Sequence, residues 1–291
     1  MGAPNRRAAF KMELTNYNDV NSLLARHGFR LEKSKGQNFL IAPWVPEKIA
    51  EQAILDGTTG VVEIGPGVGC LTEQLAKRAG KVLAYELDKA LKPVLAETLS
   101  QSKNIEFLFD DVMRCDLARD IKERLPGLRP VLCANLPYNI TTPVLTKVYE
   151  ARCVDTATVM VQKEVAERIC ALPGDAAYGS FSVFTRWYAE PQIMFTVGPD
   201  CFMPRPKVTS AVVHMKMRKD PPEDVDEAAF FQTVRAAFGQ RRKTLANALS
   251  VICPKEKVIA SIAACGFDER VRGEELSIPE FAALTKSLLE I

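Results

Sequence analysis

The strongest constraint on the fold is an alternation, between about residues 45 and 165, of short apolar segments rich in β-branched residues with segments of helical periodicity. This alternation is typical of a parallel sheet covered by helices. In chain order the expected strands are 60–65, 81–88, 105–111, 130–135 and 156–162. The expected helices are 71–80, 89–99, 117–125 and 163–171.

The rhythm changes after about residue 175. A helix is expected over 178–190, and two strand-like runs, 192–197 and 207–217, then follow with no helix between them. Consecutive strands without a crossover helix predict an antiparallel pair, which would close the edge of the sheet.

A polar segment with two prolines, 218–226, is the expected domain boundary. Apolar residues beyond it recur at spacings near 3.6, which predicts an all-α domain. The helical segments are 227–240, 242–252, 255–266 and 278–290. We therefore expect a flexible leader at 1–20, an α/β domain at 21–219 and a small helical domain at 220–291.

Composition excludes several classes of protein. No apolar run approaches the roughly 20 residues of a membrane helix, and the N-terminal segment lacks the apolar core of a secretory signal, so we expect a cytoplasmic protein without a membrane contact. The chain has eight cysteines, none of them in a C-x-x-C pair, and only two histidines, so we expect no metal site.

Net charge is +2 but uneven, being +5 over residues 1–219 and −3 over 220–291. This balance allows a nucleic-acid partner without requiring one. Basic residues cluster at 26–37, at Arg205 and Lys207, and at 240–243. Taken singly, each cluster is better explained as an ordinary solvated face.

Three glycines, Gly65, Gly67 and Gly69, lie between an expected strand and an expected helix, where the backbone can come close to a ligand. This turn suits either a nicotinamide dinucleotide or S-adenosylmethionine. Glu86 ends the second strand, where a carboxylate can bind ribose hydroxyls, and Asp111 ends the third, near an adenine amino group. Both acids would serve either cofactor, and each could instead be a capping or surface acid.

The fourth strand separates these alternatives. It ends in Asn135, Leu136, Pro137 and Tyr138, which offer no proton relay for hydride transfer. The amide oxygen of Asn135 and the backbone carbonyl of Leu136 could accept the two N–H bonds of an exocyclic adenine amine and direct its lone pair at a methyl donor. Pro137 would fix the backbone and Tyr138 would stack on the extruded base. The alternative is a plain turn.

Six segments in order, covering about residues 20–290, resemble the ribosomal small-subunit RNA adenine dimethyltransferase family. They are "GQNFL" (36–40), "EIGPGVGCLT" (63–72), "ANLPYNITTP" (134–143), "VQKEVAERI" (161–169), "CFMPRPKVTSAVV" (201–213) and "QRRKTLANAL" (240–249). The resemblance implies a Rossmann-like class I S-adenosylmethionine-dependent methyltransferase domain with a mostly parallel seven-stranded sheet, and a small all-α C-terminal domain. It also implies N6,N6-dimethylation of two adjacent adenosines in a hairpin loop near the 3′ end of small-subunit rRNA.

The resemblance and the motifs together predict a site. The cofactor-binding residues are Gln37, Asn38, Leu40, Gly65, Gly67, Glu86, Leu87, Asp111, Val112 and Asn135. The residues expected at the target adenine are Asn135, Leu136, Pro137, Tyr138 and Phe202. The residues expected to contact RNA are Arg205, Lys207, Arg241, Arg242 and Lys243. Gln37 could instead cap a helix, and Phe202 could belong to the core.

The expected partner is small-subunit rRNA within a 30S or pre-30S particle, and the expected state is a monomer with a role in subunit biogenesis. One rival interpretation is a methyltransferase of large-subunit rRNA of the antibiotic-resistance type. Another is a non-catalytic ribosome-assembly or transcription factor on the same fold, against which the intact Glu86, Asp111 and Asn135 argue. A dehydrogenase is a more distant alternative.

Overall fold

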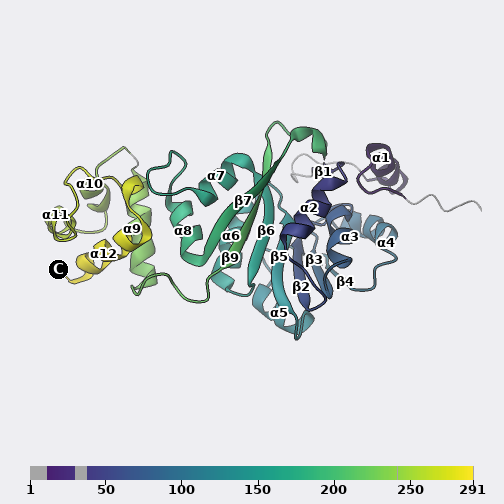
Figure 1. Ribbon diagram of the computed structural model, residues 1–291, viewed down its shortest axis with the longest axis horizontal. Helices are drawn as coiled ribbons and strands as arrows, with labels where there is room; N and C mark the ends of the chain where they lie inside the picture. The colour runs from purple at the N-terminus through teal and green to yellow at the C-terminus, as the bar shows by residue number, and fades with distance from the viewer. Residues whose placement is uncertain (1–11, 30–37, 241, 291) are drawn as a thin grey trace, which may run out of the picture.

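The computed structural model describes residues 12–29, 38–240 and 242–290, and its centre is a seven-stranded sheet in the order β4-β3-β2-β5-β6-β9-β7 (Figure 1). The strands are β2 (Thr59–Ile64), β3 (Lys81–Tyr85), β4 (Ile105–Leu108), β5 (Arg129–Asn135), β6 (Thr156–Gln162), β7 (Ala189–Val197) and β9 (Ser210–Met217). A separate two-stranded sheet joins β1 (Phe39–Leu40) to β8 (Phe202–Met203).

The strands from β4 to β6 are parallel, whereas β9 enters antiparallel between β6 and β7. The register places Ser210, the first residue of β9, opposite Gln162 at the end of β6. The predicted α/β class and the antiparallel closing pair are both confirmed. All parallel strands therefore end at the same edge of the sheet.

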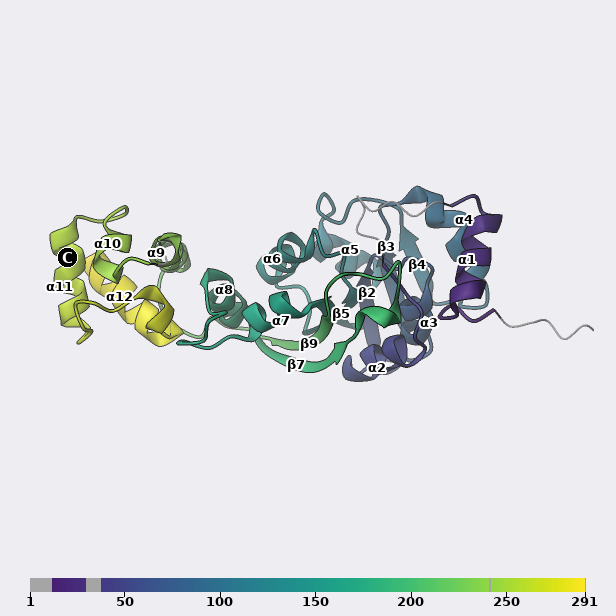
Figure 2. The same ribbon diagram turned by 90° about the horizontal axis from the view of Figure 1, so that it is seen from above.

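Helices cover both faces of the sheet (Figures 1 and 2). Alternation along β2 divides the core, because Val61 packs in the cluster that holds α1 to α4 while Val62 packs in the cluster that holds α5 to α8. One set is α1 (Tyr17–Arg26), α2 (Trp44–Gln52), α3 (Cys70–Ala76) and α4 (Lys92–Thr98), with a short η2 turn (Lys89–Leu91) before α4. The other is α5 (Leu117–Arg124), α6 (Thr141–Ala151), α7 (Lys163–Cys170) and α8 (Ser180–Tyr188).

Helix α1 differs from the expected flexible leader over residues 1–20. It begins at Tyr17, and the side chain of Asn16 caps it by accepting the backbone N–H groups of Asn18 and Asp19. Val20 is fully buried in the core. The packed structure therefore reaches into the segment assigned to the leader, because apolar residues at helical spacing bring α1 onto the sheet domain.

The predicted C-terminal helical segments are present as α9 (Glu227–Gly239), α10 (Leu245–Leu249), α11 (Lys255–Ala264) and α12 (Ile278–Glu290), with an η4 turn (Gly273–Glu275) before α12. They gather at one end of the long axis of the molecule, beyond α8 (Figures 1 and 2). α9 contacts α8, α10 and α12. The domain boundary at 218–226 remains a prediction, although that segment contains neither helix nor strand.

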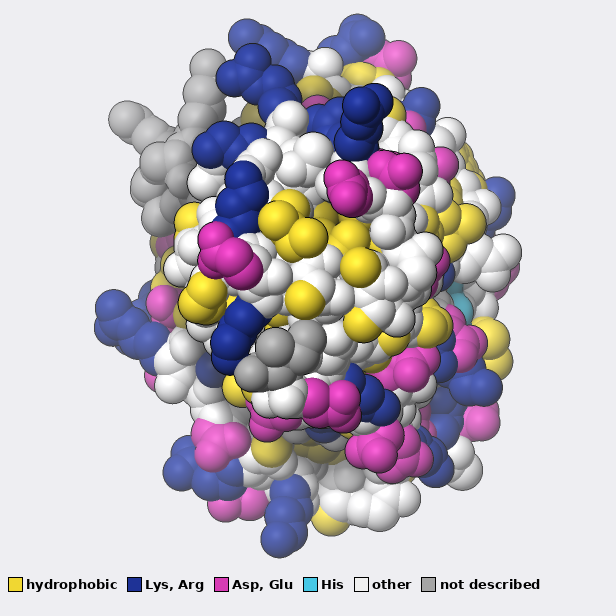
Figure 3. All heavy atoms as spheres, turned by 90° about the vertical axis from the view of Figure 1, so that its left-hand side faces the viewer, with side chains coloured by type: hydrophobic (Ala, Val, Ile, Leu, Met, Phe, Trp, Pro, Cys, Tyr) yellow, Lys and Arg dark blue, Asp and Glu magenta, His cyan; other side chains and the backbone are white. Residues whose placement is uncertain are grey.

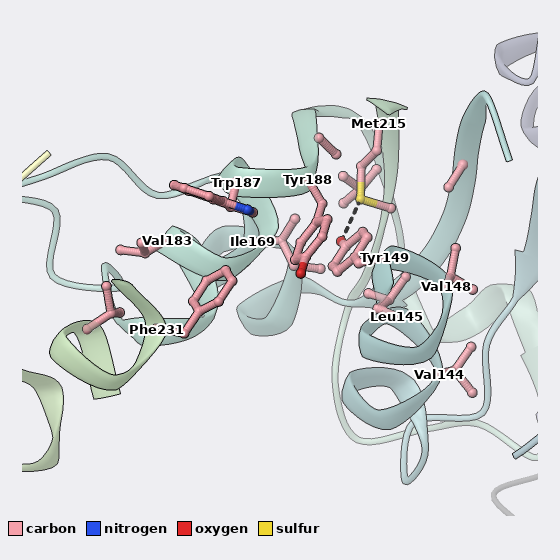
Figure 4. Close-up of a cluster of buried hydrophobic side chains, with 14 of the residues drawn as sticks. Val144, Leu145, Val148, Tyr149, Ile169, Val183, Trp187, Tyr188, Met215 and Phe231 are labelled. Atoms are coloured by element: carbon pink, nitrogen blue, oxygen red, sulfur yellow. Dashed lines mark hydrogen bonds between the residues drawn. The ribbon is translucent and has the colours of Figure 1, made fainter. Parts of the chain in front are cut away.

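An aromatic cluster joins α8 to α9 (Figure 4). The rings of Trp187 and Phe230 are stacked with centroids 4.2 Å apart, and Phe231 packs edge-on against Trp187 at 5.5 Å. The carboxylate of Glu227 accepts hydrogen bonds from the indole N–H of Trp187 at 3.1 Å and from the hydroxyl of Tyr188 at 2.5 Å. The C-terminal helices are thus attached to the sheet domain by a continuous core.

Truncating a side chain of this cluster should lower the stability of the protein. We expect Phe231→Ala to lower the free energy of unfolding by about 3 to 5 kcal/mol, because it removes a buried ring that contacts both helices. Chemical denaturation followed by circular dichroism measures this change. Leu289→Ala, at a position 62% exposed on α12, is the control and should stay within about 0.5 kcal/mol of the unaltered protein. Equal effects of the two variants would show that the junction is not part of the core.

Candidate active site

The carboxyl ends of β2, β3 and β5 and the loop after β4 surround a cavity of about 230 Å³. This is the edge at which open α/β sheets bind ligands. Every described residue of the predicted cofactor site lines it: Asn38, Leu40, Gly65, Gly67, Glu86, Leu87, Asp111, Val112 and Asn135. Gln37 lies outside the described residues. Five segments distant in sequence therefore contribute to a single concave site.

The glycine turn forms one wall of the cavity. Gly65, Gly67 and Gly69 have φ angles of 74°, 60° and 93°, a backbone region that residues with a Cβ rarely adopt. A Cβ on Gly67 would lie 3.0 Å from the ring of Phe39, which also lines the cavity. Glycine thus serves both the backbone conformation of the turn and its close packing against β1.

Glu86 follows β3 directly and is 6% exposed. Burial raises the pKa of its carboxyl to about 7, although backbone N–H groups of Asp88 and Gly67 act in the opposite direction. One carboxylate oxygen accepts the Asp88 N–H at 2.8 Å. The carboxyl is thus oriented by the backbone at the cavity wall.

Glu63 is a site residue that the sequence analysis did not identify. It lies in β2, lines the cavity and is 1% exposed. Burial raises the pKa of its carboxyl to about 8; the side chain of Thr72 acts in the opposite direction, and the charge of Glu86 adds to the rise. No described residue bonds its Oε2, which is unusual for a buried carboxyl. The signal in the sequence was an acid inside an apolar strand, two residues before the glycine turn.

Asp111 lies beyond the expected strand end, because β4 stops at Leu108 and the loop continues to the cavity. The Asp111 side chain accepts the backbone N–H of Met113 at 2.9 Å, which holds the loop in a turn. Asp110 lines the cavity beside it. The structure therefore places two neighbouring acids at this wall, where the sequence indicated one.

The loop after β5 carries the predicted target site. The backbone N–H of Leu136 donates to the carbonyl of Met160 at 3.1 Å, and the carbonyl of Pro137 accepts the N–H of Ile140 at 3.1 Å. These bonds fix the loop. Among the described residues none bonds the side-chain amide of Asn135, which lines the cavity and remains available to a ligand.

Tyr138 lines the same cavity and is half-buried. Its hydroxyl lies 2.7 Å from the hydroxyl of Ser210, and burial raises the pKa of the phenol. Phe202, the second aromatic expected at the base, is instead 2% exposed and packs in the core on the α1–α4 side of the sheet. Its strand β8 pairs with β1, with Phe202 opposite Leu40, so the structure does not bring Phe202 to the cavity wall.

The expected RNA-contacting residues fall into two separate groups. Arg205 and Lys207 follow β8 and are exposed, with Arg205 paired to Asp200 at 2.9 Å. Arg242 and Lys243 are exposed between α9 and α10, and Arg241 lies outside the described residues. Since β8 pairs with β1 and α9–α10 lie at the far end of the long axis, the two groups form no single patch (Figure 1).

The end of the molecule formed by the C-terminal helices carries apolar side chains at its centre, surrounded by Lys and Arg side chains with Asp and Glu among them (Figure 3). Over residues 12–29, 38–240 and 242–290, no group of three or more His, Cys, Asp or Glu side chains could hold a metal ion. The same residues include no helix long and apolar enough to cross a membrane.

The two buried carboxyls should make the stability of the protein depend on pH. The folded protein keeps Glu63 protonated up to about pH 8, whereas its carboxyl has an unperturbed pKa of 4.5. The free energy of unfolding should therefore fall as pH rises from about 4.5 to 8, by at most about 1.4 kcal/mol per pH unit for this group. Denaturant titrations at pH 5, 6, 7 and 8 measure the slope.

Glu63→Gln should reduce this slope, leaving the smaller contribution of Glu86, which ends near pH 7. The control is Glu123→Gln, at an exposed position of α5, and its slope should match that of the unaltered protein. An unchanged slope in Glu63→Gln would mean that this carboxyl is ionised in the folded protein at neutral pH.

Comparisons with known proteins identify the family of this chain. A family model described as "Ribosomal RNA adenine dimethylase" matches residues 28–290. "Ribosomal RNA small subunit methyltransferase A" of Geobacillus thermodenitrificans is 45% identical, covering 94% of this chain and 96% of the relative. The same-named protein of Listeria innocua is 44% identical over 93% of this chain and 95% of its own length.

Among solved structures, the 23S rRNA methyltransferase ErmE superposes with a TM-score of 0.67 and 28% identity, covering 86% of this chain and 99% of its own. A dimethyladenosine transferase from Plasmodium falciparum has a TM-score of 0.73 over 84% of this chain and 95% of its own; at 24% identity it supports the fold alone. The chain belongs to the ribosomal RNA adenine dimethylase family.

Proposed function

We propose that this chain transfers methyl groups from S-adenosylmethionine to N6 of adenosine in small-subunit rRNA, twice on each of two adjacent bases. The observation that carries the proposal is the Asn135 amide at the end of β5, which no described residue bonds, in the same cavity as Glu86 and the glycine turn. The acceptor of the methyl group would be a neutral amine, and a neutral amide can bind such an amine without a charged side chain.

The residues of the cavity fit the cofactor. Glu86 would accept hydrogen bonds from the ribose hydroxyls, and Asp111 would accept a hydrogen bond from the adenine amino group. The turn at Gly65 and Gly67 would let the methionyl part lie against the backbone. Oε2 of Glu63, which no described residue bonds, would accept a hydrogen bond from its ammonium group, and this would explain a buried carboxyl oxygen without a partner. S-adenosylmethionine supplies an electrophilic methyl group on a sulfonium.

The reaction needs an oriented amine more than a strong base. The Asn135 amide oxygen and the Leu136 carbonyl would each accept one N–H bond of the adenine amine and draw its lone pair toward the methyl group. The new N–C bond would form as the S–C bond breaks, and the nitrogen would then lose a proton to water. Tyr138 would hold the base by stacking, a contact worth about 1 to 3 kcal/mol.

The small subunit is the favoured substrate because relatives 44–45% identical over more than nine-tenths of this chain carry the small-subunit name, while the named large-subunit enzyme is 28% identical. The substrate would be the rRNA within a 30S or pre-30S particle, met by a monomer in the cytoplasm. Arg205, Lys207, Arg242 and Lys243, all exposed, would contact its backbone.

The role of the amide has a direct test. Asn135→Ala should lower kcat by about 100- to 1,000-fold, since the oriented acceptor is lost, and should leave the affinity for RNA nearly unchanged. Single-turnover transfer of labelled methyl groups and equilibrium binding measure the two effects. The control is Asn18→Ala, at an exposed position of α1, which should behave as the unaltered protein. Retained transfer by Asn135→Ala would refute the assigned role.

The substrate is tested by offering labelled S-adenosylmethionine with undermethylated small subunits, large subunits and naked rRNA, followed by mapping of the modified bases. We expect dimethyladenosine at two adjacent positions of the small-subunit RNA. Label on the large subunit alone would favour the resistance-type methyltransferase. Tight binding to small subunits with no transfer of label would favour a non-catalytic assembly factor.

A further inference from the structure

We propose that Ser210 is a positioning residue of the target-base site, which holds the ring of Tyr138 in the orientation required for stacking. The inference rests on the proposed function and adds to it a residue outside the cavity wall. Ser210 is fully buried, and its hydroxyl lies 2.7 Å from the Tyr138 hydroxyl, the outer end of a ring that lines the cavity.

Both ends of this hydrogen bond have fixed places. Ser210 is held in the sheet, because it begins β9 and pairs with Gln162 on one side and with Val197 on the other. The preceding residue is also tied, since the carbonyl of Thr209 accepts the N–H of Lys163 at 2.9 Å. The hydroxyl of Ser210 is therefore a rigid point to which a side chain on a loop can be anchored.

Tyr138 by contrast lies in the loop between β5 and α6. The backbone bonds around Pro137 fix the path of the loop, but they do not fix rotation of the Tyr138 side chain about its χ angles. One hydrogen bond at the far end of the ring limits both χ angles at once. Removing it would leave the ring present but less ordered, which affects the rate of a reaction that depends on the orientation of the base.

The segment 201–210 then contacts the site at two points. At its start, β8 pairs with β1 and supports Phe39 and Leu40, which line the cavity. At its end, Ser210 bonds Tyr138 across the carboxyl end of β6. The segment therefore supports two parts of the cavity wall without lining it. The burial of Phe202 fits this supporting role better than direct stacking on the base.

The test compares Ser210→Ala, Tyr138→Phe and the double variant, each of which loses the hydrogen bond while the ring stays. The matched control is Thr158→Val, which removes another fully buried hydroxyl between β6 and β9, bonded to Nδ1 of His214 at 2.9 Å and outside the cavity lining. The measurements are kcat for methyl transfer to undermethylated small subunits, cofactor affinity and melting temperature.

We expect Ser210→Ala and Tyr138→Phe each to lower kcat about three- to tenfold, the range of one neutral hydrogen bond, with unchanged cofactor affinity. The double variant should lose no more than either single variant, because all three lack the same bond. Thr158→Val should lose as much thermal stability as Ser210→Ala and keep its kcat. A kcat of Ser210→Ala equal to that of Thr158→Val, or a multiplicative loss in the double variant, would overturn the proposal.

A measurement independent of methyl transfer separates this proposal from the proposed function. With selectively labelled tyrosine, the ring resonances of Tyr138 should shift and sharpen toward a mobile side chain in Ser210→Ala and not in Thr158→Val. Identical spectra in the two variants would overturn the role of Ser210. Failure of the unaltered protein to methylate any rRNA would overturn the proposed function, and the ring spectra would still decide whether Ser210 fixes Tyr138.

Discussion

The burial of the parallel sheet on both faces determines where this protein can do chemistry. All six residues of β2 are buried, and alternate ones face the α1–α4 helices and the α5–α8 helices. A strand covered in this way can offer functional groups only at its ends. Because the strands from β4 to β6 run parallel, their carboxyl ends share one edge, and the glycine turn, Glu86 and Asn135 meet there.

The same coverage explains the electrostatics of the cavity. Glu63 and Glu86 lie in surroundings of low polarity, and burial is the largest cause of the raised pKa of each. Two neighbouring buried carboxyls are unfavourable when both are charged and no cation is near. A ligand that brings a positive charge and hydrogen-bond donors would relieve this cost. The cavity is thus better suited to S-adenosylmethionine than to a nicotinamide dinucleotide, whose phosphates would add negative charge.

Local patterns were sufficient to predict most of the fold. Runs of β-branched residues located β2 to β6, and spacings near 3.6 located α9 to α12, since both signals depend on near neighbours in the chain. The glycine turn, Glu86 and Asn135 could be predicted because they mark strand ends. Helix α6 was missed, since it follows the cavity loop directly and begins with two threonines and a proline, residues of low helix propensity.

Features that depend on tertiary packing could not be predicted in this way. Phe202 was expected at the base, but its exposure is decided by the pairing of β8 with β1, two segments about 160 residues apart. The bond between Tyr138 and Ser210 is equally invisible in sequence, because the two residues become neighbours only when β9 inserts beside β6. Glu63 lies in an apolar strand, and only the folded structure shows that the cavity opens beside its side chain.

The attachment of the C-terminal helices limits the kind of substrate that fits. Glu227 and Phe231 join α9 to α8 through buried aromatic contacts and hydrogen bonds, which opposes free hinging of the helices. Exposed Arg242 and Lys243 are therefore held at a set distance from the cavity, at the other end of the long axis. An RNA that fills the cavity and also contacts Arg242 and Lys243 must therefore span the whole distance between them, because the buried junction opposes any shortening of that distance.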